Sequence, residues 1–550
     1  MNRNHLLIVG SLLLVYLIGF GINIMDVDAA QYASMSREML RSGNYLHIYD
    51  TGIEYLDKPP FLFWISALSM KIFGINNFAY RLPSFLFALL AVLSTYKLAK
   101  LFYTQKTALL SALILATSQG FFLMNHDVRT DTILMGCVAF SIWQLAAWFQ
   151  TNKILHFILG CVGIGLGMMT KGPIALLVPC FGFFIHFLLQ RNFKAFLKWE
   201  YILAILIIGA LLIPMSWGLY DQFDLHPNKI VNGKTGVSGL RFFYWTQSFG
   251  RITGESVWNN GAGIGFLLQN MLWSFLPWIL FFIAALIWQI KNIVQQKFSM
   301  SKNAEAICIG GFILTYLSLG MSKYQLPHYI FVGFPFAAII TAVYLNQLFN
   351  ENQNSKWLKV FTNVHVVLFS LLWIAILLLL KIPFETIHVL FFIFAILLFI
   401  LMIYFFIKIK DYKKKLIFLC LFTIIGLNLF LNAAIYPALL EYQTGSKMGK
   451  YIKKNQINPN NVFTYKFEVM RSIHFYSDGF IREKNNLDSI KSGEYIITSE
   501  ETLKDISNAK KVFSILKMGE DFGITRLSLI FLNPQTRKSV VTKYALIKIK

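Results

Sequence analysis

The sequence predicts an all-α polytopic membrane protein of about thirteen transmembrane helices, followed by a small α/β domain. Hydrophobic residues make up 56% of the 550-residue chain and charged residues only 14%, and the mean hydropathy is +0.57. Apolar stretches of about twenty residues, the length that crosses a bilayer as a helix, recur up to residue 436. Lys and Arg residues gather in the short loops between these stretches.

The predicted spans follow one another closely along the chain. The first has a short basic start at Arg3, as a signal peptide does, but no small-residue cleavage site follows it. We therefore expect it to remain as the first transmembrane helix. The apolar stretches lie at residues 5–25, 82–101, 107–124, 132–150, 154–170, 172–190, 201–220, 263–289, 305–321, 329–348, 357–380, 385–408 and 415–436.

The distribution of basic residues predicts which side of the membrane each loop faces. The loops rich in Lys and Arg all fall on one side, and the positive-inside rule makes that side cytoplasmic. The N-terminus is then cytoplasmic, whereas two long loops, 26–81 and 221–262, face outward together with the C-terminal tail. The basic loops are 97–106, 191–200, 291–302, 351–359 and 408–415.

The net charge of +23 does not indicate a nucleic-acid-binding protein. The Lys and Arg residues are spread over short membrane loops, as the positive-inside rule requires, so we expect no nucleic acid as a partner. The five cysteines lie inside apolar stretches without metal-ligand spacing, which is typical of packing residues.

The segment 437–550 differs in composition from the rest of the chain. It mixes charges of both signs with short alternating apolar runs, such as Glu494–Thr498 and Val541–Ile549. Its aromatic and β-branched residues favour a folded domain over a disordered tail. We expect two domains: a transmembrane domain over 1–436 and an extracytoplasmic α/β domain over 437–550.

The first outer loop holds an amphipathic segment that begins beside two carboxylates. From Asp28, apolar residues recur at helical spacing until Gly43, which predicts a helix of about fifteen residues along the outer membrane interface. Asp28 can act as the cap of this helix, with Gln31 completing a capping box. The neighbouring Asp26 is a second carboxylate, which is more than a cap requires.

A second short helix is predicted after Asp57 and Lys58, where two prolines follow. Proline favours the first turn of a helix and glycine the position past its end, so Phe61–Phe73, closed by Gly74, is expected to be helical. Lys58 then lies beside a helix N-terminus, where backbone amides favour an anion. The alternative is a lysine that extends to the lipid headgroups.

These residues carry a resemblance to a known group of enzymes. The Asp with its amphipathic helix, the motif Asp-Lys-Pro-Pro at 57–60 and the motif Ala-Tyr-Arg-Leu-Pro at 79–83 resemble the lipid A aminoarabinose transferases. The protein O-mannosyltransferases, which share their GT-C class, are similar as well. The resemblance spans roughly residues 1–345 and is strongest over 26–90. It implies a glycosyltransferase of the bacterial cytoplasmic membrane that takes sugar from a polyprenyl-phosphate carrier.

The resemblance assigns roles to residues of the first outer loop. Asp28, four residues before Tyr32 as in the family pattern, matches the base that takes the proton of an acceptor hydroxyl. Asp26 is the second choice for this base. Tyr32 and Asp57 are expected to contact the substrate, and Lys58 matches the lysine that contacts the carrier phosphate.

Further cations and a tyrosine are expected around the same phosphate. Arg251 matches the phosphate-binding arginine of the family, while Lys171 and Lys323 are additional candidates. Tyr329 matches the tyrosine of a family segment that lines the phosphate site. These cations lie on the outward side, where the positive-inside rule disfavours them, which by itself indicates a bound anion.

The resemblance also implies a pair of side chains at the sugar site. Arg129 and Asp131 match a family Arg/Asp pair that faces the sugar, and Asp131 is expected to be catalytic. The alternative is that the two side chains form an ion pair with each other and cap a helix.

A divalent metal is the one cofactor that the resemblance implies. The family binds it through the carboxylate before the lysine, here Asp57, and through the histidine of a Glu-His pair. Gln247 and Ser248 stand at the positions of that pair, so His226, on the same loop, is the remaining candidate ligand.

The expected reaction is an inverting transfer of sugar from a polyprenyl-phosphate carrier to a hydroxyl or phosphate acceptor on lipid A, a protein or a surface glycan. The alternative is a transporter or lipid flippase for an anionic lipid-linked substrate, whose essential charges would lie near the bilayer midplane. A structural or assembly protein would leave the paired carboxylates and the outward cations unexplained. Release of polyprenyl phosphate from a sugar-loaded carrier distinguishes a transferase from both.

We expect alkaline phosphatase fused after Gln443 to be active and the same enzyme fused after Lys414 to be inactive. Only the first fusion point faces outward under the positive-inside rule. The measurement is phosphatase activity in cells that express both fusions at equal levels. The reverse pattern would contradict the predicted topology.

Overall fold

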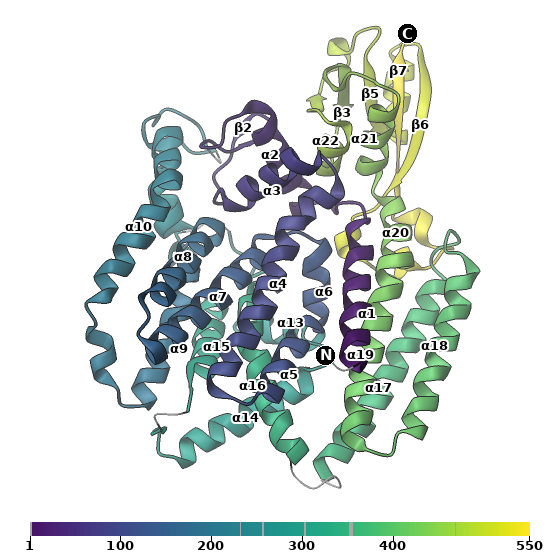
Figure 1. Cartoon of the computed structure of the whole chain (residues 1–550). Helices are drawn as coiled ribbons and strands as arrows, with labels where there is room; N and C mark the ends of the chain where they lie inside the picture. The colour runs from purple at the N-terminus through teal and green to yellow at the C-terminus, as the bar shows by residue number, and fades with distance from the viewer. Residues whose placement is uncertain (1–2, 232, 256–257, 302–303, 351–355, 468) are drawn as a thin grey trace.

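The computed structural model describes residues 3–231, 233–255, 258–301, 304–350, 356–467 and 469–550. Helices form a broad bundle, and a small sheet domain stands on one end of it (Figure 1). The predicted basic loops 291–302 and 351–359 fall partly outside the described residues. The predicted combination of a helical membrane bundle and a small C-terminal sheet domain is confirmed.

Eight described helices are long and apolar enough to cross a membrane, and a bent pair brings the number to nine. These eight or nine support only part of the predicted count of about thirteen spans. The eight are α4 (Asn77–Phe102), α7 (Thr130–Thr151), α8 (Ile154–Lys171), α10 (Glu200–Leu219), α16 (Phe334–Asn350), α17 (Lys356–Lys381), α18 (Val389–Lys408) and α19 (Tyr412–Phe430).

Shorter apolar helices complete the bundle. In the bent pair, α5 (Gln105–Ala116) and α6 (Gln119–His126) meet at 56°. The remaining helices of the bundle are α1 (Arg3–Phe20), α9 (Ile174–Leu189), α13 (Phe266–Ser274), α14 (Ile279–Gln295) and α15 (Ile307–Gly320).

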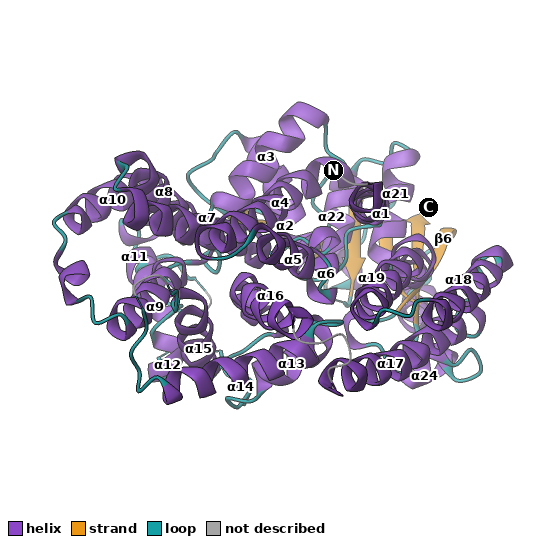
Figure 2. Ribbon diagram, turned by 60° about the horizontal axis from the view of Figure 1, so that its bottom comes forward, coloured by secondary structure: helices purple, strands orange, loops and turns teal. Residues whose placement is uncertain are grey.

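The helices differ strongly in how much of their surface the bundle covers. The apolar window of α7 is 83% buried, whereas that of α18 is 11% buried and leaves its side chains to face lipid. A view of the other end shows α17 and α18 at one edge of the bundle and α10 at the opposite edge (Figure 2). Gly136 of α7 allows close packing on α4, because a Cβ atom there would lie 2.5 Å from the Phe87 carbonyl oxygen. The central helix α7 is therefore buried in the bundle and packs closely on α4.

Two helices of the first outer loop match their predictions. The helix α2 spans Asp28–Ser42 and ends at Gly43, whose φ of 71° is in the left-handed region that favours glycine. The helix α3 spans Phe61–Phe73. A two-stranded hairpin, β1 (Tyr49–Asp50) and β2 (Ile53–Glu54), lies between them in the chain.

The expected capping of α2 was wrong. Val27 occupies the N-cap position, no side chain caps the helix, and Gln31 donates a hydrogen bond to Asp50 instead of completing a capping box. The helix α2 packs against both α3 and a helix of the C-terminal domain, α22 (Arg471–Ser477). Arg37 and Arg41 of α2 contact this domain through Asp478.

The C-terminal domain is built on a five-stranded sheet with the order β4-β3-β5-β7-β6. The strands β4, β3 and β5 run parallel, and β7 and β6 join antiparallel. The strands β5 and β7 coincide with the two predicted alternating runs. The elements are α20 (Tyr436–Leu439), α21 (Thr444–Lys454), β3 (Val462–Tyr465), α22, β4 (Arg482–Lys484), β5 (Tyr495–Ser499), α23 (Glu500–Asn508), β6 (Phe513–Asp521), α24 (Leu529–Leu532) and β7 (Thr542–Ile549).

Arg81 of α4 connects the end of α1 to the rest of the bundle. Its fully buried guanidinium donates hydrogen bonds to four backbone oxygens, those of Phe20, Ile22, Asn23 and His126, at 2.6–3.2 Å. The Ile22 carbonyl also accepts a hydrogen bond from Asn77, but Arg81 is the donor to the other three, which would be costly to leave unpaired where water is excluded. The entry of the chain into the first outer loop, and so the start of α2, depends on this side chain.

We expect Arg81→Met to destabilise the protein by about 3 kcal/mol or more, because it leaves buried carbonyls unpaired. Thermal unfolding of purified protein in detergent measures the effect. The control is Arg41→Met, since the Arg41 side chain is 63% exposed. Equal unfolding temperatures of the two variants would contradict the role of Arg81.

Candidate functional site

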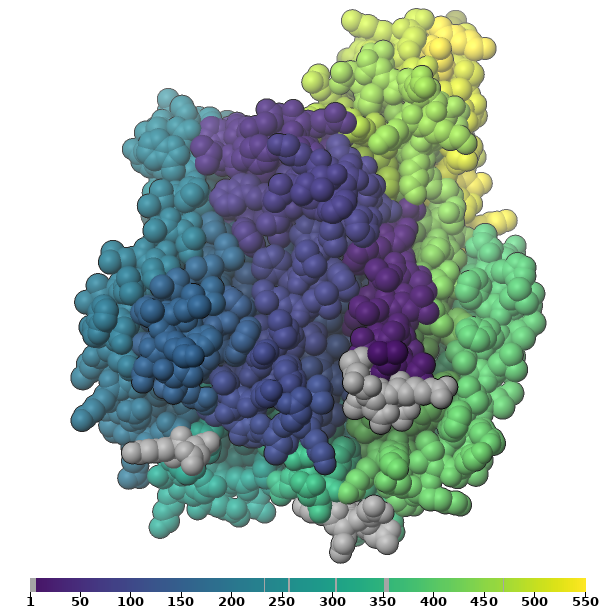
Figure 3. All heavy atoms as spheres, viewed as in Figure 1, coloured from purple at the N-terminus to yellow at the C-terminus, as the bar shows by residue number. Residues whose placement is uncertain are grey.

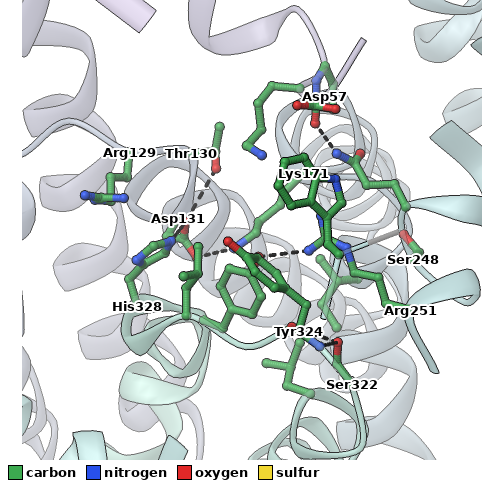
Figure 4. A pocket seen from close by; sticks show the side chains of 18 of the residues that line it. Asp57, Arg129, Thr130, Asp131, Lys171, Ser248, Arg251, Ser322, Tyr324 and His328 are labelled. Atoms are coloured by element: carbon green, nitrogen blue, oxygen red, sulfur yellow. Dashed lines mark hydrogen bonds and ion pairs between the residues drawn. The ribbon is translucent and has the colours of Figure 1, made fainter. Parts of the chain in front are cut away.

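A cavity of about 520 Å³ with several charged side chains in its walls lies where the outer loops meet the ends of the central helices. This volume is within the range of small-molecule sites, about 300–1,000 Å³. The walls come from the start of α2, the segment before α3, the start of α7, the end of α8, residues 247–252 of the second outer loop and residues 318–329. Figure 4 shows Asp131 and His328 together on one side of the cavity, and Arg251 and Ser248 on the opposite side.

One wall holds an ion pair between Asp28 and Arg129. The two side chains meet at 2.5 Å, and Arg129 also contacts the carboxylate of Asp127 at 2.8 Å. Burial lowers the pKa of Arg129, but the two carboxylates outweigh this effect and hold the pKa above its ordinary value. The Asp28 side chain remains 38% exposed. One carboxylate oxygen is thus held by a permanent cation while the group stays accessible from the cavity.

Next to this pair, Asp131 and Lys171 form a second ion pair. Asp131 is almost fully buried, and its other carboxylate oxygen lies 3.6 Å from His328 Nε2. The Lys171 ammonium also lies 3.9 Å from the centre of the Tyr329 ring, a cation–π distance. The alternative in which Arg129 pairs with Asp131 is therefore wrong, because each has another partner.

The opposite wall presents two cations, Lys58 and Arg251. Neither has a carboxylate within 4 Å among the described residues. Within the described chain, the Lys58 ammonium makes no hydrogen bond or ion pair of this length. Burial lowers the pKa of Lys58, and the Asp57 carboxylate opposes that effect. Arg251 donates from Nη1 to the Tyr329 hydroxyl at 2.9 Å, and its buried Nε has no partner among the described residues. Buried donors of this kind favour an anion.

The cavity brings together nine of the predicted site residues. Asp26, Lys323 and His226 are not among the residues that line it. The nine that do are Asp28, Tyr32, Asp57, Lys58, Arg129, Asp131, Lys171, Arg251 and Tyr329.

Asp26 lies outside the cavity and faces the C-terminal domain. Its carboxylate accepts hydrogen bonds from the backbone N–H and the hydroxyl of Ser472, both at 2.7 Å. Burial raises the pKa of Asp26 to about 6, although the bonds from Ser472 oppose this shift. Lys323 has a local role too, since its backbone N–H donates to the Arg251 carbonyl at 3.2 Å.

The residues of the implied metal site do not fit a metal. His226 is exposed on the second outer loop and away from the cavity, while Asp57 lines it. Gln247, on that loop, donates a hydrogen bond to the Asp57 backbone oxygen. In the described part of the chain, no three His, Cys, Asp or Glu side chains gather as metal ligands. We therefore derive no chemical step from a metal.

Sequence reasoning missed several residues of the cavity wall. Gln31, Tyr55, Trp258 and Tyr324 also line it, as does His328. His328 directly precedes Tyr329, so its proximity to Asp131 could have been considered. Gln31 lies on α2, and Tyr55, Trp258 and Tyr324 come from loops whose course depends on tertiary contacts.

Comparison with known proteins points to glycosyltransferases. The family model "Dolichyl-phosphate-mannose-protein mannosyltransferase" matches residues 57–217. An undecaprenyl phosphate-alpha-4-amino-4-deoxy-L-arabinose arabinosyl transferase of Enterobacter sp. (strain 638) is 28% identical over 334 residues, which cover 58% of this chain and 55% of that protein. An uncharacterised protein of Aquifex aeolicus is 27% identical, with 88% of each chain covered. The chain thus spans little more than half the length of the matched Enterobacter transferase.

Solved structures with the same fold include membrane glycosyltransferases. The crystal structure of ArnT from Cupriavidus metallidurans bound to undecaprenyl phosphate superimposes with a TM-score of 0.75 at 15% identity, covering 98% of this chain and 97% of that one. An Archaeoglobus fulgidus oligosaccharyltransferase reaches 0.51 at 11% identity, with 90% and 70% covered. These similarities establish the fold of the chain.

Proposed function

We propose that this chain, a GT-C-type membrane protein that resembles the aminoarabinose transferases in sequence and fold, is a glycosyltransferase. Its donor would be a sugar linked to polyprenyl phosphate of the undecaprenyl type. Its acceptor would be a hydroxyl or phosphate group of lipid A, a protein or a surface glycan. The names of the similar proteins support this class of donor, and the cavity supports the chemistry.

Positive charge in the cavity exceeds the negative charge that pairs with it, and this excess supports the proposal. Lys171 already has a carboxylate partner in Asp131, whereas Lys58 and Arg251 have none within 4 Å in the described chain. A phosphate group would supply the missing negative charge. Charge-assisted hydrogen bonds from Lys and Arg to phosphate are strong enough to hold it there.

The transfer requires that a proton leave the acceptor as its oxygen attacks the anomeric carbon. Asp28 is the proposed base, because its carboxylate is accessible and Arg129 holds it in one orientation. The bond between the anomeric carbon and the phosphate oxygen breaks as the new bond forms on the opposite face, which inverts the configuration. The acceptor proton goes to Asp28, and the electron pair goes to the phosphate.

The leaving group is a phosphate and needs cations rather than an acid. Negative charge on its oxygens increases as the glycosidic bond breaks, so contacts from Lys58 and Arg251 strengthen in the transition state. The Tyr329 hydroxyl orients Arg251 and also lines the cavity. Asp131 and Arg129, on the opposite wall, remain the proposed contacts of the sugar, whereas Lys171 remains the weaker candidate for the carrier phosphate because Asp131 already balances its charge.

We propose that more helices cross the membrane than the eight or nine that are long and apolar enough to do so by length and composition. Four shorter apolar helices, α1, α9, α14 and α15, would also cross the membrane, giving thirteen spans in a domain of residues 1–436. The turns after α4, α9, α14 and α18 lie at the end of the bundle away from the sheet domain (Figure 1). These turns carry the basic residues, so the cavity and domain 437–550 would face outward from the bacterial cytoplasmic membrane.

We expect Asp28→Asn to abolish turnover while leaving undecaprenyl phosphate binding nearly intact, because the amide cannot accept the proton. Asp26→Asn should retain activity, because its amide oxygen can still accept a bond from Ser472. The assay measures release of undecaprenyl phosphate from a sugar-loaded carrier by purified protein. An active Asp28→Asn variant beside an inactive Asp26→Asn variant would reverse the assignment.

We expect Lys58→Ala and Arg251→Ala each to lower the catalytic rate about ten- to a hundredfold. Each variant loses a charge-assisted hydrogen bond of about 1.5–3 kcal/mol to the leaving phosphate. Lys58→Arg should restore only part of the rate, since a planar guanidinium does not replace a compact ammonium.

The matched control is Lys71→Ala, because Lys71 is an exposed lysine at the end of α3 and does not line the cavity. If Lys58 only extended to lipid headgroups, its variant would behave like this control. Wild-type turnover in both cavity variants would exclude the proposed phosphate site. Absence of carrier cleavage in the wild-type protein, with substrate uptake into vesicles, would favour the transporter.

A further inference from the structure

The C-terminal domain contacts residues on either side of Asp28 in the sequence, one before it and one after it. Asp26, two residues before Asp28, is bound by Ser472 of α22. Gln31, three residues after Asp28, is bound through Asp50 to Arg471 of the same helix. The first turn of α2 is thus fixed by two adjacent residues of a domain that lies over 400 residues later in the chain.

Asp50 is the centre of the second contact. One of its carboxylate oxygens accepts a hydrogen bond from Gln31 Nε2 and another from Arg471 Nη1, both at 2.7 Å. The carboxylate is 11% exposed, and its second oxygen has no partner in the described chain. Arg471 is the only cation within 4 Å of it among the described residues. A carboxylate this enclosed is costly to leave without a cation.

The helix α22 is itself held rigidly by the domain. It packs against α21, where Gly445 and Gly449 lie one helical turn apart and face it. A Cβ atom at Gly445 would come within 2.6 Å of the Ser472 hydroxyl, and one at Gly449 within 2.9 Å of the Ile473 carbonyl oxygen. The two helices therefore pack too closely for α22 to shift independently.

The far end of α2 has its own contact with the domain. Arg41 pairs with Asp478 at 2.7 Å, beyond the end of α22. Thirteen residues of helix, about 20 Å, separate Arg41 from Asp28. In Figure 3 the domain stands directly beside the first outer loop on the outer surface. The same interface thus contains Arg471 near the cavity and the exposed Arg41 remote from it.

We propose that Arg471 is a positioning residue: through Asp50 and Gln31 it fixes the first turn of α2, and with it the Asp28 carboxylate. Arg471 does not line the cavity and would touch neither sugar nor phosphate. Gln31 does line it, so the hydrogen-bonded chain ends at the cavity wall. The effect on catalysis rests on the function proposed for Asp28, whereas the contact of Arg471 with Asp50 is independent of that function.

We expect Arg471→Met to lower kcat about tenfold, because small displacements of a catalytic group cost rate. The KM for the sugar-loaded carrier should stay within about twofold, since Lys58 and Arg251 are untouched. The assay uses full-length protein with undecaprenyl phosphate-4-amino-4-deoxy-L-arabinose as donor and lipid A as acceptor. Arg471→Lys should restore part of kcat, because the ammonium can still pair with Asp50.

Arg41→Met is the matched control, since it removes an arginine from the same interface at the remote end of α2. It should leave kcat unchanged. Combining Arg471→Met with Asp50→Asn should cost less than the product of the two single losses, because the unpaired carboxylate is gone. The inference would be overturned if the kcat loss of the double variant equalled the product of the two single losses. It would also be overturned if Arg41→Met lost as much kcat as Arg471→Met.

A second measurement needs no sugar substrate. Hydrogen exchange of the full-length protein, read by mass spectrometry, should become faster over residues 28–33 in Arg471→Met and stay unchanged there in Arg41→Met. Unchanged exchange in Arg471→Met would overturn the inference whatever the enzyme assay shows. Faster exchange in a protein that never cleaves the carrier would support the contact and reject the proposed function instead.

Discussion

The ion pair between Asp28 and Arg129 joins the outer loop to the membrane bundle at the cavity. Asp28 begins α2, and Arg129 immediately precedes the central helix α7. At 2.5 Å, with Asp127 as a further partner, the guanidinium fixes where the outer loop lies over the bundle. The proposed base therefore has a defined position relative to α7, whose next residues include Asp131.

Charge is distributed unevenly around the cavity, and this gives each wall a different chemistry. On one wall, each cation has a carboxylate partner, so little net charge remains to attract a phosphate. On the other, Lys58 and Arg251 have no carboxylate within 4 Å in the described chain. An anion would bind there, while the paired carboxylates remain available to polar hydroxyl groups. A phosphate-linked sugar could contact both walls at once.

The C-terminal domain gives the outer loop a rigid support. Loops at a membrane surface order poorly unless they are held, and the first outer loop is held by a packed α/β unit. Asp26 belongs to this support rather than to the cavity, because its carboxylate is occupied by Ser472. Two carboxylates two residues apart thus serve different purposes. One stays open to the cavity, and the other binds the domain.

The sequence by itself determined the membrane-spanning class, the helices α2 and α3 and the two alternating strands of the tail, because hydropathy, helical spacing and proline or glycine boundaries are local. It also identified the Asp, Lys and Arg side chains that line the cavity, together with Tyr32 and Tyr329, since outward cations and carboxylates stand out against an apolar chain and match a family pattern. It ranked Asp28 before Asp26 by resemblance, but it could not reveal the partners of Asp26, Arg129 and Asp131.

Those choices depend on which side chains meet across long sequence separations. The contact of Asp26 with Ser472 joins residues 446 apart, and that of Arg129 with Asp28 joins residues 101 apart. Local propensity carries no information about such pairs. Only the packing of α22 on α2 decided which carboxylate is bound by the domain and which one faces the cavity. A carboxylate that is bound by Ser472 cannot at the same time face the cavity.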